Sequence, residues 1–245
     1  MYLVLMRHAL AAKNLEDRHG GAGSSLTPEG RVQALHVAQS LNHRHLYPRM
    51  VFSSPVPQAL ETARYLSRCF GAPVSADDRL RPLGLGCIAG LSCAEAATRY
   101  PEALRSIEDW RSGRIELGEL VLPEAEDYRE FFARGLRFLL GVVECRHDVI
   151  VVGTRSVLIL LASIILGRTI LPGGGYRDIQ IAPSAHLTFR RVKSGFLYMP
   201  TLSTCILDDG SRPKAGPTAA LRTGSAPQPE EGMTTGFAAC PRASG

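Results

Sequence analysis

Short apolar runs alternate with longer segments of helical periodicity along most of the chain. Residues 2–6, 50–53 and 149–153 are apolar runs that end in polar loops, a pattern typical of buried central strands. Weaker runs predict further strands at residues 74–76, 179–181 and 186–190. All of these runs are too short for ordinary helices, so we interpret them as the strands of a sheet.

The segments between these runs have the signals of α-helices. Thr27 is a favourable N-cap and Pro28 fits the first helical position, so we expect a helix from there to about Asn42. Its predicted buried stripe consists of Val32, Leu35, Ala38 and Leu41. Further helices are expected at residues 57–69, 92–112, 125–145 and 156–166, with a Gly-rich loop at residues 79–91.

Strands that alternate with helices predict an α/β fold. The expected architecture is a three-layer α/β/α sandwich with a mostly parallel central sheet. A length of 245 residues accommodates one such domain, which we place at residues 1–208. Residues 209–245 contain five Pro and six Gly among Ala and other small residues, so we expect a disordered tail there.

The composition and the apolar runs limit the classes of partner and the cellular location that we expect. The formal charge of +5 is mild for this length, and no Lys/Arg cluster is dense enough for a nucleic-acid surface. The apolar run at residues 1–6 is too short for a signal-peptide core, and the apolar stretch at residues 157–166 has about half the length that spans a bilayer. We therefore expect a cytoplasmic protein with no membrane or nucleic-acid partner.

The six cysteines do not indicate a metal site or a disulfide framework. They form no CxxC pair, and none stands at metal-ligand spacing from a histidine. Reduced thiols are expected in a chain without a secretion signal. We accordingly predict no bound metal and no cofactor, and the oligomeric state cannot be read from these patterns.

The sharpest chemical signal is the Arg7-His8 pair at the end of the first predicted strand, followed by a loop that contains Asn14. Ligands bind at the carboxyl ends of strands in α/β sheets. A histidine nitrogen can attack phosphorus and form a phosphoenzyme, and an adjacent guanidinium can clamp the phosphoryl oxygens. An isolated Arg-His dipeptide is more often a pair of surface residues, so the surrounding motifs decide between the two interpretations.

Those motifs occur in a fixed order along the chain. Residues 7–14, RHALAAKN, are similar to the signature RHGxxxxN, residues 26–34, LTPEGRVQA, to LTxxGxxQA, and residues 53–63, SSPVPQALETA, to SSPLxRAxxTA. The loop at residues 80–91, the Glu126/Arg134 pair and residues 151–157 follow in the positions of LxExxxGxxEG, GES…R and VSHGG. Over roughly residues 1–192 the chain therefore resembles the histidine phosphatase superfamily, which has the phosphoglycerate-mutase-like fold.

The resemblance implies a phosphoryl pocket with five core groups: an Arg-His pair, a second arginine, a second histidine and an acid that protonates the leaving group. Arg7 and His8 match the first pair and are the implied catalytic residues. The second arginine falls on Gln58, the acid on Pro82 and the second histidine on Thr154. Three core positions therefore depart from the family pattern, which implies a degenerate active site.

The remaining substrate-binding residues implied by the resemblance are Asn14, Gln58, Thr154 and Arg155, while Ala9 replaces the glycine that follows the family's histidine. Arg155 either returns a positive charge to the pocket or is a surface arginine at a helix N-terminus.

Two more pairs of residues carry open alternatives. Asp77 and Asp78 either supply an acid or are solvated loop charges. Arg18 and His19 lie in the loop that contacts substrate in the family, although a structural role is the more common one for such residues.

These departures favour a weak or inactive phosphatase, a pseudoenzyme that binds a small phosphorylated or anionic metabolite. The alternative is an active phosphomonoesterase, or a repurposed metabolic enzyme, that uses His8 with an atypical acid. A structural or interaction protein with a vestigial pocket is the third possibility. The substrate itself cannot be identified, because neither residues 15–25 nor residues 92–125 contain a recognisable ligand motif.

Overall fold

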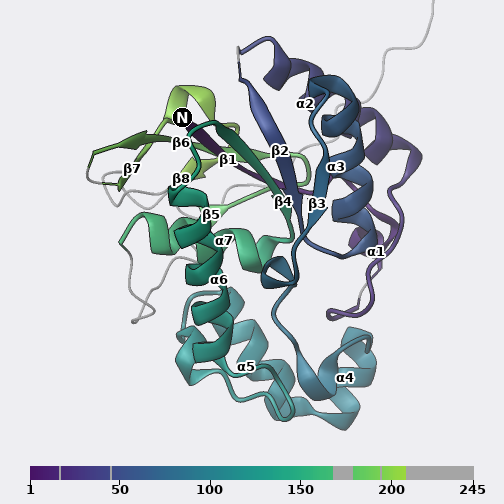
Figure 1. The fold of residues 1–245 in the computed structure, drawn as a ribbon. Coiled ribbons are helices and arrows are strands. Elements are labelled where there is room, and N and C mark those ends of the chain that lie inside the picture. Colours follow the sequence, from purple (N-terminus) through teal and green to yellow (C-terminus); the bar gives the residue numbers. More distant parts are fainter. Residues whose placement is uncertain (17, 45, 168–178, 194, 208–245) are drawn as a thin grey trace, which may run out of the picture. The chain divides into compact units, whose positions relative to one another are not determined.

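A six-stranded sheet with the strand order β3-β2-β4-β1-β6-β7 forms the centre of the fold in the computed structural model (Figure 1). The structure describes residues 1–16, 18–44, 46–167, 179–193 and 195–207. The predicted tail at residues 209–245 lies outside the described residues, so the expectation of disorder there stays a prediction.

The strands of the sheet are β1 (Tyr2–Arg7), β2 (Pro48–Ser53), β3 (Val74–Ala76), β4 (Asp148–Gly153), β6 (His186–Val192) and β7 (Gly195–Tyr198). β5 (Ile179–Gln180) and β8 (Ile206–Leu207) form a separate two-stranded sheet. The α-helices are α1 (Ala12–Leu15), α2 (Pro28–Asn42), α3 (Pro57–Phe70), α4 (Cys93–Arg99), α5 (Pro101–Arg111), α6 (Tyr128–Val143) and α7 (Arg155–Ile165). Short 3-10 turns lie at Asp78–Leu80, Gly86–Ile88, Leu117–Glu119 and Pro200–Leu202.

The strands β3, β2, β4 and β1 run parallel, whereas β6 and β7 are antiparallel additions at one edge. Because parallel strands need crossover connections, helices separate them in the sequence and cover the sheet. β1 lies between β4 and β6, and its last residue, Arg7, pairs with Gly153 at the end of β4. The predicted α/β sandwich with a mostly parallel sheet is therefore confirmed, and His8 leaves the sheet at its centre.

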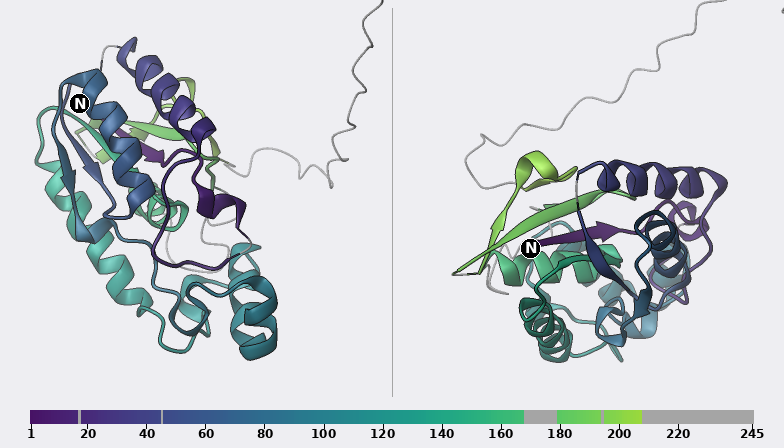
Figure 2. Two further views of the ribbon diagram at one scale, coloured as in Figure 1. Left: turned by 90° about the vertical axis from the view of Figure 1, so that its right-hand side faces the viewer. Right: turned by 45° about the horizontal axis from the view of Figure 1, so that its top comes forward.

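Side chains on alternate positions of the central strands enter two separate cores. Val4 and Met6 pack with α2 and α3, which lie side by side on one face of the sheet (Figures 1 and 2). Leu3 and Leu5 pack on the other face against α6 and α7. This alternation follows from the two-residue repeat of a β-strand, and burial on both faces explains why these strands are apolar throughout.

The structure corrects the predicted stripe of α2. Val32 and Leu35 are 54% and 44% exposed, whereas Gly30, Ala34, Ala38 and Leu41 are buried. Small side chains allow α2 to approach α3 and the loop after β1 closely. The size of the side chains therefore explains the buried face of α2 better than their apolar character does. The Thr27 N-cap is confirmed, since its hydroxyl accepts a hydrogen bond from the Gly30 amide at 3.0 Å.

The segments at residues 92–112 and 156–166 differ in how well they match their predictions. The first is divided into α4 and α5 by Tyr100-Pro101, because a proline cannot continue the hydrogen bonds of a preceding helix. The second is the buried helix α7, as expected from its apolar run. Within the part of the chain that the structure describes, no helix is both long and apolar enough to span a bilayer.

Candidate active site

A cavity of about 340 Å³ opens at the carboxyl ends of β1 and β4. Ligand sites of α/β proteins are found at this edge of the sheet. All six residues predicted for the site line the cavity, namely Arg7, His8, Asn14, Gln58, Thr154 and Arg155. Pro82, which falls where the family's acid is expected, lines it as well. The fold thus brings together residues from four separate parts of the sequence, residues 7–14, Gln58, Pro82 and residues 154–155.

The His8 imidazole is held in one orientation at the end of β1. Its side chain is 3% exposed, and its Nδ1 lies 2.8 Å from the carbonyl oxygen of Ala9. A carbonyl oxygen only accepts hydrogen bonds, so Nδ1 carries the proton and Nε2 carries the lone pair. Nε2 has no hydrogen-bond partner among the described residues and is not among the fully covered polar atoms. Nε2 is therefore the ring nitrogen that keeps an unshared lone pair.

Burial keeps the His8 imidazole neutral. Loss of hydration lowers its pKa to about 4, the Ala9 carbonyl opposes this shift, and the positive charges of Arg7 and Lys13 lower the pKa further. A pKa near 4 means that Nε2 is unprotonated at neutral pH. Lys13, which also lines the cavity, thus adds its positive charge to that of Arg7.

The backbone after His8 is fixed by contacts to both α2 and α3. The Ala9 amide donates a hydrogen bond to Thr62 Oγ1 at 3.1 Å, and the Thr62 hydroxyl donates to the Gln58 carbonyl at 2.8 Å. On the other side, a Cβ atom at Gly30 would collide with the Leu10 carbonyl oxygen, so glycine is required where α2 crosses this loop. These contacts explain the small residues and threonines in the motifs that surround Arg7-His8.

Two of the predicted substrate-binding side chains also hold loops. Asn14 Oδ1 accepts a hydrogen bond from the Ala11 amide at 2.9 Å, within the first turn after β1. Gln58 is 2% exposed, and its Oε1 accepts from the Ser24 amide at 3.1 Å. Because an arginine has no acceptor, it could not replace Gln58 in this contact with the loop.

The N-terminal end of α7 forms another wall of the cavity. Thr154 is the N-cap residue, and Thr154, Arg155 and Ser156 all line the space. Arg155 Nη2 donates to Gln180 Oε1 at 3.3 Å, which connects its guanidinium to β5. A helix N-terminus with an adjacent arginine favours a bound anion.

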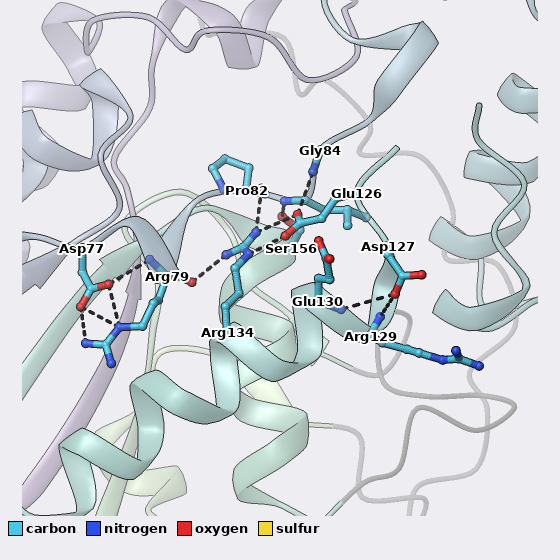
Figure 3. A network of polar contacts seen from close by, with 11 residues as sticks. Asp77, Arg79, Pro82, Gly84, Glu126, Asp127, Arg129, Glu130, Arg134 and Ser156 are labelled. Carbon is cyan, nitrogen blue, oxygen red and sulfur yellow. Dashed lines mark hydrogen bonds and ion pairs between the residues drawn. The ribbon is translucent and has the colours of Figure 1, made fainter. Parts of the chain in front are cut away.

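The loop that contains Pro82 is held by a partly buried ion pair, which Figure 3 draws from close by. Arg134 on α6 binds Glu126 with an Nε–Oε1 distance of 2.6 Å, and it donates to the Arg79 and Pro82 carbonyls at 2.6 and 3.0 Å. Glu126 in turn accepts from the Gly84 amide at 3.2 Å. Glu126 does not line the cavity, so its carboxylate has a structural role here.

The two alternative acids on this segment are not in the cavity either. Asp77 binds Arg79 at 2.6 Å (Figure 3), and this partner lowers the pKa of the Asp77 carboxyl. Neither Asp77 nor Asp78 lines the space. Among the described residues, Glu16 is the one acidic side chain in the lining.

Several lining residues were not predicted as site residues. Lys13 precedes Asn14 in the loop after β1, and Trp110 and Arg111 end α5. Lys13 could have been found, because it lies inside the first motif and only its charge was overlooked. Trp110 and Arg111 belong to no motif, and tertiary packing alone brings them to the cavity.

Arg18 and His19 differ in whether they line the cavity. Arg18 lines the cavity, although it is bound to the Gly90 carbonyl at 2.9 Å and to Glu95 at 3.4 Å. His19 is 2% exposed and is not in the lining. Its ring contacts Cys93 and Arg111, so the substrate contact considered for His19 is not direct in this arrangement.

The charge of the cavity is strongly asymmetric. Its described lining contains five cationic side chains, Arg7, Lys13, Arg18, Arg111 and Arg155, against the single carboxylate of Glu16. Clefts lined by one sign of charge concentrate ligands of the opposite sign. The described lining therefore combines an excess of positive charge with a neutral, buried histidine.

Known proteins share the sequence pattern and the fold. The chain is 33% identical over 129 residues to a glucosyl-3-phosphoglycerate phosphatase of Mycolicibacterium vanbaalenii, covering 49% of this chain and 56% of that protein. It is 33% identical over 173 residues to a 2,3-bisphosphoglycerate-dependent phosphoglycerate mutase of Nitratidesulfovibrio vulgaris, covering 60% and 66%. The chain thus spans about half to two thirds of the length of these relatives.

A solved structure of a mycobacterial glucosyl-3-phosphoglycerate phosphatase with inorganic phosphate superposes with a TM-score of 0.64 at 23% identity, covering 81% of this chain and 94% of that one. At this identity the likeness shows the fold. The model of the histidine phosphatase superfamily (branch 1) matches residues 3–194, most of the chain. The chain belongs to branch 1 of the histidine phosphatase superfamily.

Proposed function

We propose that this chain binds a small phosphorylated or anionic metabolite in the cavity and hydrolyses ordinary alkyl phosphates slowly or not at all. One observation carries the proposal: Pro82 lines the cavity where the family resemblance places an acid, and the nearby Glu126 carboxylate is engaged by Arg134. The five cations of the lining support anion binding, whereas the lining residues of that loop, Pro82, Leu83 and Leu85, carry no group that can protonate a leaving group.

The retained His8 supports the first half of a phosphoryl transfer. Its Nε2 lone pair forms an N–P bond while the bond from phosphorus to the leaving oxygen breaks, and that oxygen keeps the electron pair. Water then attacks phosphorus, breaks the N–P bond and releases phosphate. An alkoxide leaving group needs a proton during the first step, whereas p-nitrophenolate leaves readily without one.

The expected loss of rate is large. A positioned general acid contributes about 10²- to 10⁴-fold in rate. Each preorganised donor that no longer stabilises the phosphoryl charge costs roughly 10²- to 10³-fold, although such losses do not multiply cleanly. Gln58 and Thr154 stand where the resemblance places two such donors, so alkyl phosphates are expected to react near background.

A second candidate function is a working phosphomonoesterase with an atypical acid. The observation that favours it is Glu16, whose carboxylate lines the same cavity as His8. Lys13 and Arg155 would then take over charge stabilisation from the replaced groups. Both of the relatives described above have names that specify phosphatase or mutase activity, which fits this candidate as well.

Initial rates with two substrates separate the candidates. For the full chain, hydrolysis of p-nitrophenyl phosphate is expected to exceed that of glycerol 3-phosphate by at least about 10²-fold, because only the alkyl ester needs an acid. Inorganic phosphate should bind in calorimetry and inhibit the p-nitrophenyl phosphate reaction competitively. Comparable rates for the two esters would contradict the proposal.

The Glu16→Gln variant tests the second candidate directly. If glycerol 3-phosphate is hydrolysed well, the loss of that activity in Glu16→Gln, with p-nitrophenyl phosphate hydrolysis retained, would identify Glu16 as the acid. Glu29→Gln is the matched control, because Glu29 lies in the first turn of α2 and does not line the cavity.

A further inference from the structure

The first motif contains a lysine at a position that the family signature leaves open. Lys13 lies in α1, the short helix after β1 (Figure 1), between the histidine and the asparagine of RHGxxxxN. Its backbone is anchored, because its amide donates a hydrogen bond to Ser24 Oγ at 2.8 Å. The Ala12 amide likewise donates to the Ser25 carbonyl at 3.2 Å. These contacts hold α1 against residues 24–25 and fix the point from which the Lys13 side chain extends.

The Lys13 side chain brings a positive charge to the cavity. It is half-buried and lines the same space as His8. Loss of hydration lowers the pKa of the ammonium, and the Glu16 carboxylate opposes this shift. Among the described residues, no carboxylate lies within ion-pair distance of Lys13. The ammonium is therefore a cation of this cavity that no paired carboxylate neutralises.

The Lys13 ammonium also keeps donors for a ligand. An ammonium has three N–H donors and no acceptor. Its hydrogen-bond partner among the described residues is the Gly21 carbonyl, at a long Nζ–O distance of 3.5 Å. Two donors therefore stay available, and they carry a full positive charge on a compact group.

Gln58 adds neutral donors to the same cavity. Its side chain is 2% exposed, and its Oε1 accepts a hydrogen bond from the Ser24 amide. Its amide nitrogen Nε2 has no hydrogen-bond partner among the described residues, and it is not one of the fully covered polar atoms. Because Gln58 lines the cavity, the two N–H groups on Nε2 are available to a bound anion.

Ser24 connects Lys13 to Gln58. Its hydroxyl accepts from the Lys13 amide, and its own amide donates to Gln58 Oε1. The neighbouring Gly23 has a positive φ of 88°, and a Cβ atom there would collide with Gln58 Oε1. One loop residue thus fixes the backbone of the cation and the side chain of the neutral donor. An arginine at position 58 would have no acceptor for this contact.

We propose that Lys13 and Gln58 together take the place of the second arginine that the family resemblance implies. The Lys13 ammonium supplies the positive charge, and the Gln58 amide supplies neutral donors, to the oxygens of a phosphoryl group bound at His8. This inference rests on the proposed function, because it takes the phosphoryl group to lie at His8. It follows that the replacement of arginine by Gln58 leaves the cavity able to bind phosphate.

Inorganic phosphate is the probe, and calorimetric titration of the full chain is the measurement. Lys13→Gln should raise the Kd for phosphate about tenfold or more, as expected when a hydrogen bond to a charged group is lost. Lys13→Arg, which keeps the charge, should recover most of this affinity. Lys193→Gln is the matched control, because Lys193 is an exposed lysine between β6 and β7 that does not line the cavity.

Gln58→Glu tests the amide. A carboxylate keeps an oxygen acceptor for the Ser24 amide but has no N–H donor when it is ionised. The Kd for phosphate should therefore rise about tenfold or more, while the free energy of unfolding in urea stays close to that of the wild-type chain. An unchanged Kd would show that the Gln58 amide does not contact the phosphoryl group.

The results for Lys13 decide the inference. It is overturned if phosphate binds to Lys13→Gln as tightly as to Lys193→Gln, or if Lys13→Arg loses as much affinity as Lys13→Gln. Failure of the wild-type chain to bind phosphate would instead overturn the proposed function, and this inference with it. Circular dichroism checks that each variant is folded, and Lys13→Met, which keeps an unbranched side chain, replaces Lys13→Gln if that variant is not.

Discussion

Two buried histidines on neighbouring strands differ in what their ring nitrogens contact. His8 follows the end of β1, and His186 begins β6 opposite Met6. They are 3% and 1% exposed, and burial lowers the pKa of each to about 4. Judged by burial and pKa alone, the two regions are alike.

The contacts of the rings separate the two histidines. His186 Nε2 lies 3.1 Å from the Leu202 carbonyl and its Nδ1 lies 3.2 Å from Thr204 Oγ1, so both nitrogens are occupied. At His8 only Nδ1 has a partner among the described residues, and the ring lines a cavity rich in cationic side chains. A lowered pKa therefore indicates only that a histidine is buried. A ring nitrogen without a partner, in a histidine that lines a cationic cavity, indicates a candidate catalytic residue.

The variant with the largest expected effect tests whether His8 is a nucleophile that lacks a general acid and two charge-stabilising groups. The triple variant Pro82→Glu, Gln58→Arg and Thr154→His should raise the rate with alkyl phosphates by about 10²-fold or more, because it returns an acid and two charge-stabilising groups. Single changes should do little, since groups that act as a unit are not additive. Steady-state kinetics with glycerol 3-phosphate measure the effect.

The structure identifies the weak point of this repair. Gln58→Arg removes the acceptor of the Ser24 amide, so the loop at residues 20–25 must find another contact. A quadruple variant with His8→Gln is the control, and it should be inactive. A correctly folded triple variant that stays inactive would show that the cavity no longer supports this chemistry, and would favour a binding role alone.

The next effect compares the two histidines directly. His8→Gln should lower p-nitrophenyl phosphate hydrolysis by at least about 10²-fold, because it removes the attacking nitrogen. His186→Gln should change this rate by less than about threefold, and should lower the free energy of unfolding by about 1–3 kcal/mol through lost buried hydrogen bonds. Rapid-quench detection of a phosphoenzyme should succeed with His186→Gln and fail with His8→Gln. Equal losses of activity in both variants would contradict the distinction.

Sequence patterns predicted the central strands and α7 well because burial on both faces makes these segments apolar throughout. They failed on α2, where Val32 and Leu35 looked like core residues but the tight approach of the helix favoured Gly30 and Ala34. The short strands β7 and β8 were missed, since their pairing depends on partners and not on local pattern.

The residues of the site that belong to sequence motifs could be predicted, and the others could not. The six predicted residues and Pro82 meet in one cavity because the motifs follow the strand ends and helix starts of the sheet. Arg111 and Trp110 were not predictable, because nothing in the local sequence of α5 distinguishes a cavity residue from a surface residue. The role of Gln58 in holding Ser24 likewise depends on a contact between distant segments.

The smallest effect is a pH dependence of stability that both histidines share. Each is neutral in the folded protein down to about pH 4, whereas the unfolded chain binds a proton near the ordinary histidine value of 6.5. As the pH falls below 6.5 the unfolded state takes up protons that the folded state does not, so the free energy of unfolding must decrease. Stability is therefore fully present above pH 6.5, and the loss is complete near pH 4.

Urea unfolding at pH 7.5 and 5.5 measures this loss, because lowering the pH to about one unit below the unfolded-state pKa costs about 1.4 kcal/mol for each histidine. His8→Gln and His186→Gln should each remove about half of the combined effect, even though only the first abolishes activity. His36→Gln is the matched control, because it removes an exposed imidazole on α2 and not a buried one. If either buried variant retains the full difference, that histidine is not held neutral by the fold. For His8 this result would remove the physical reason for an unprotonated nucleophile at the base of the cavity.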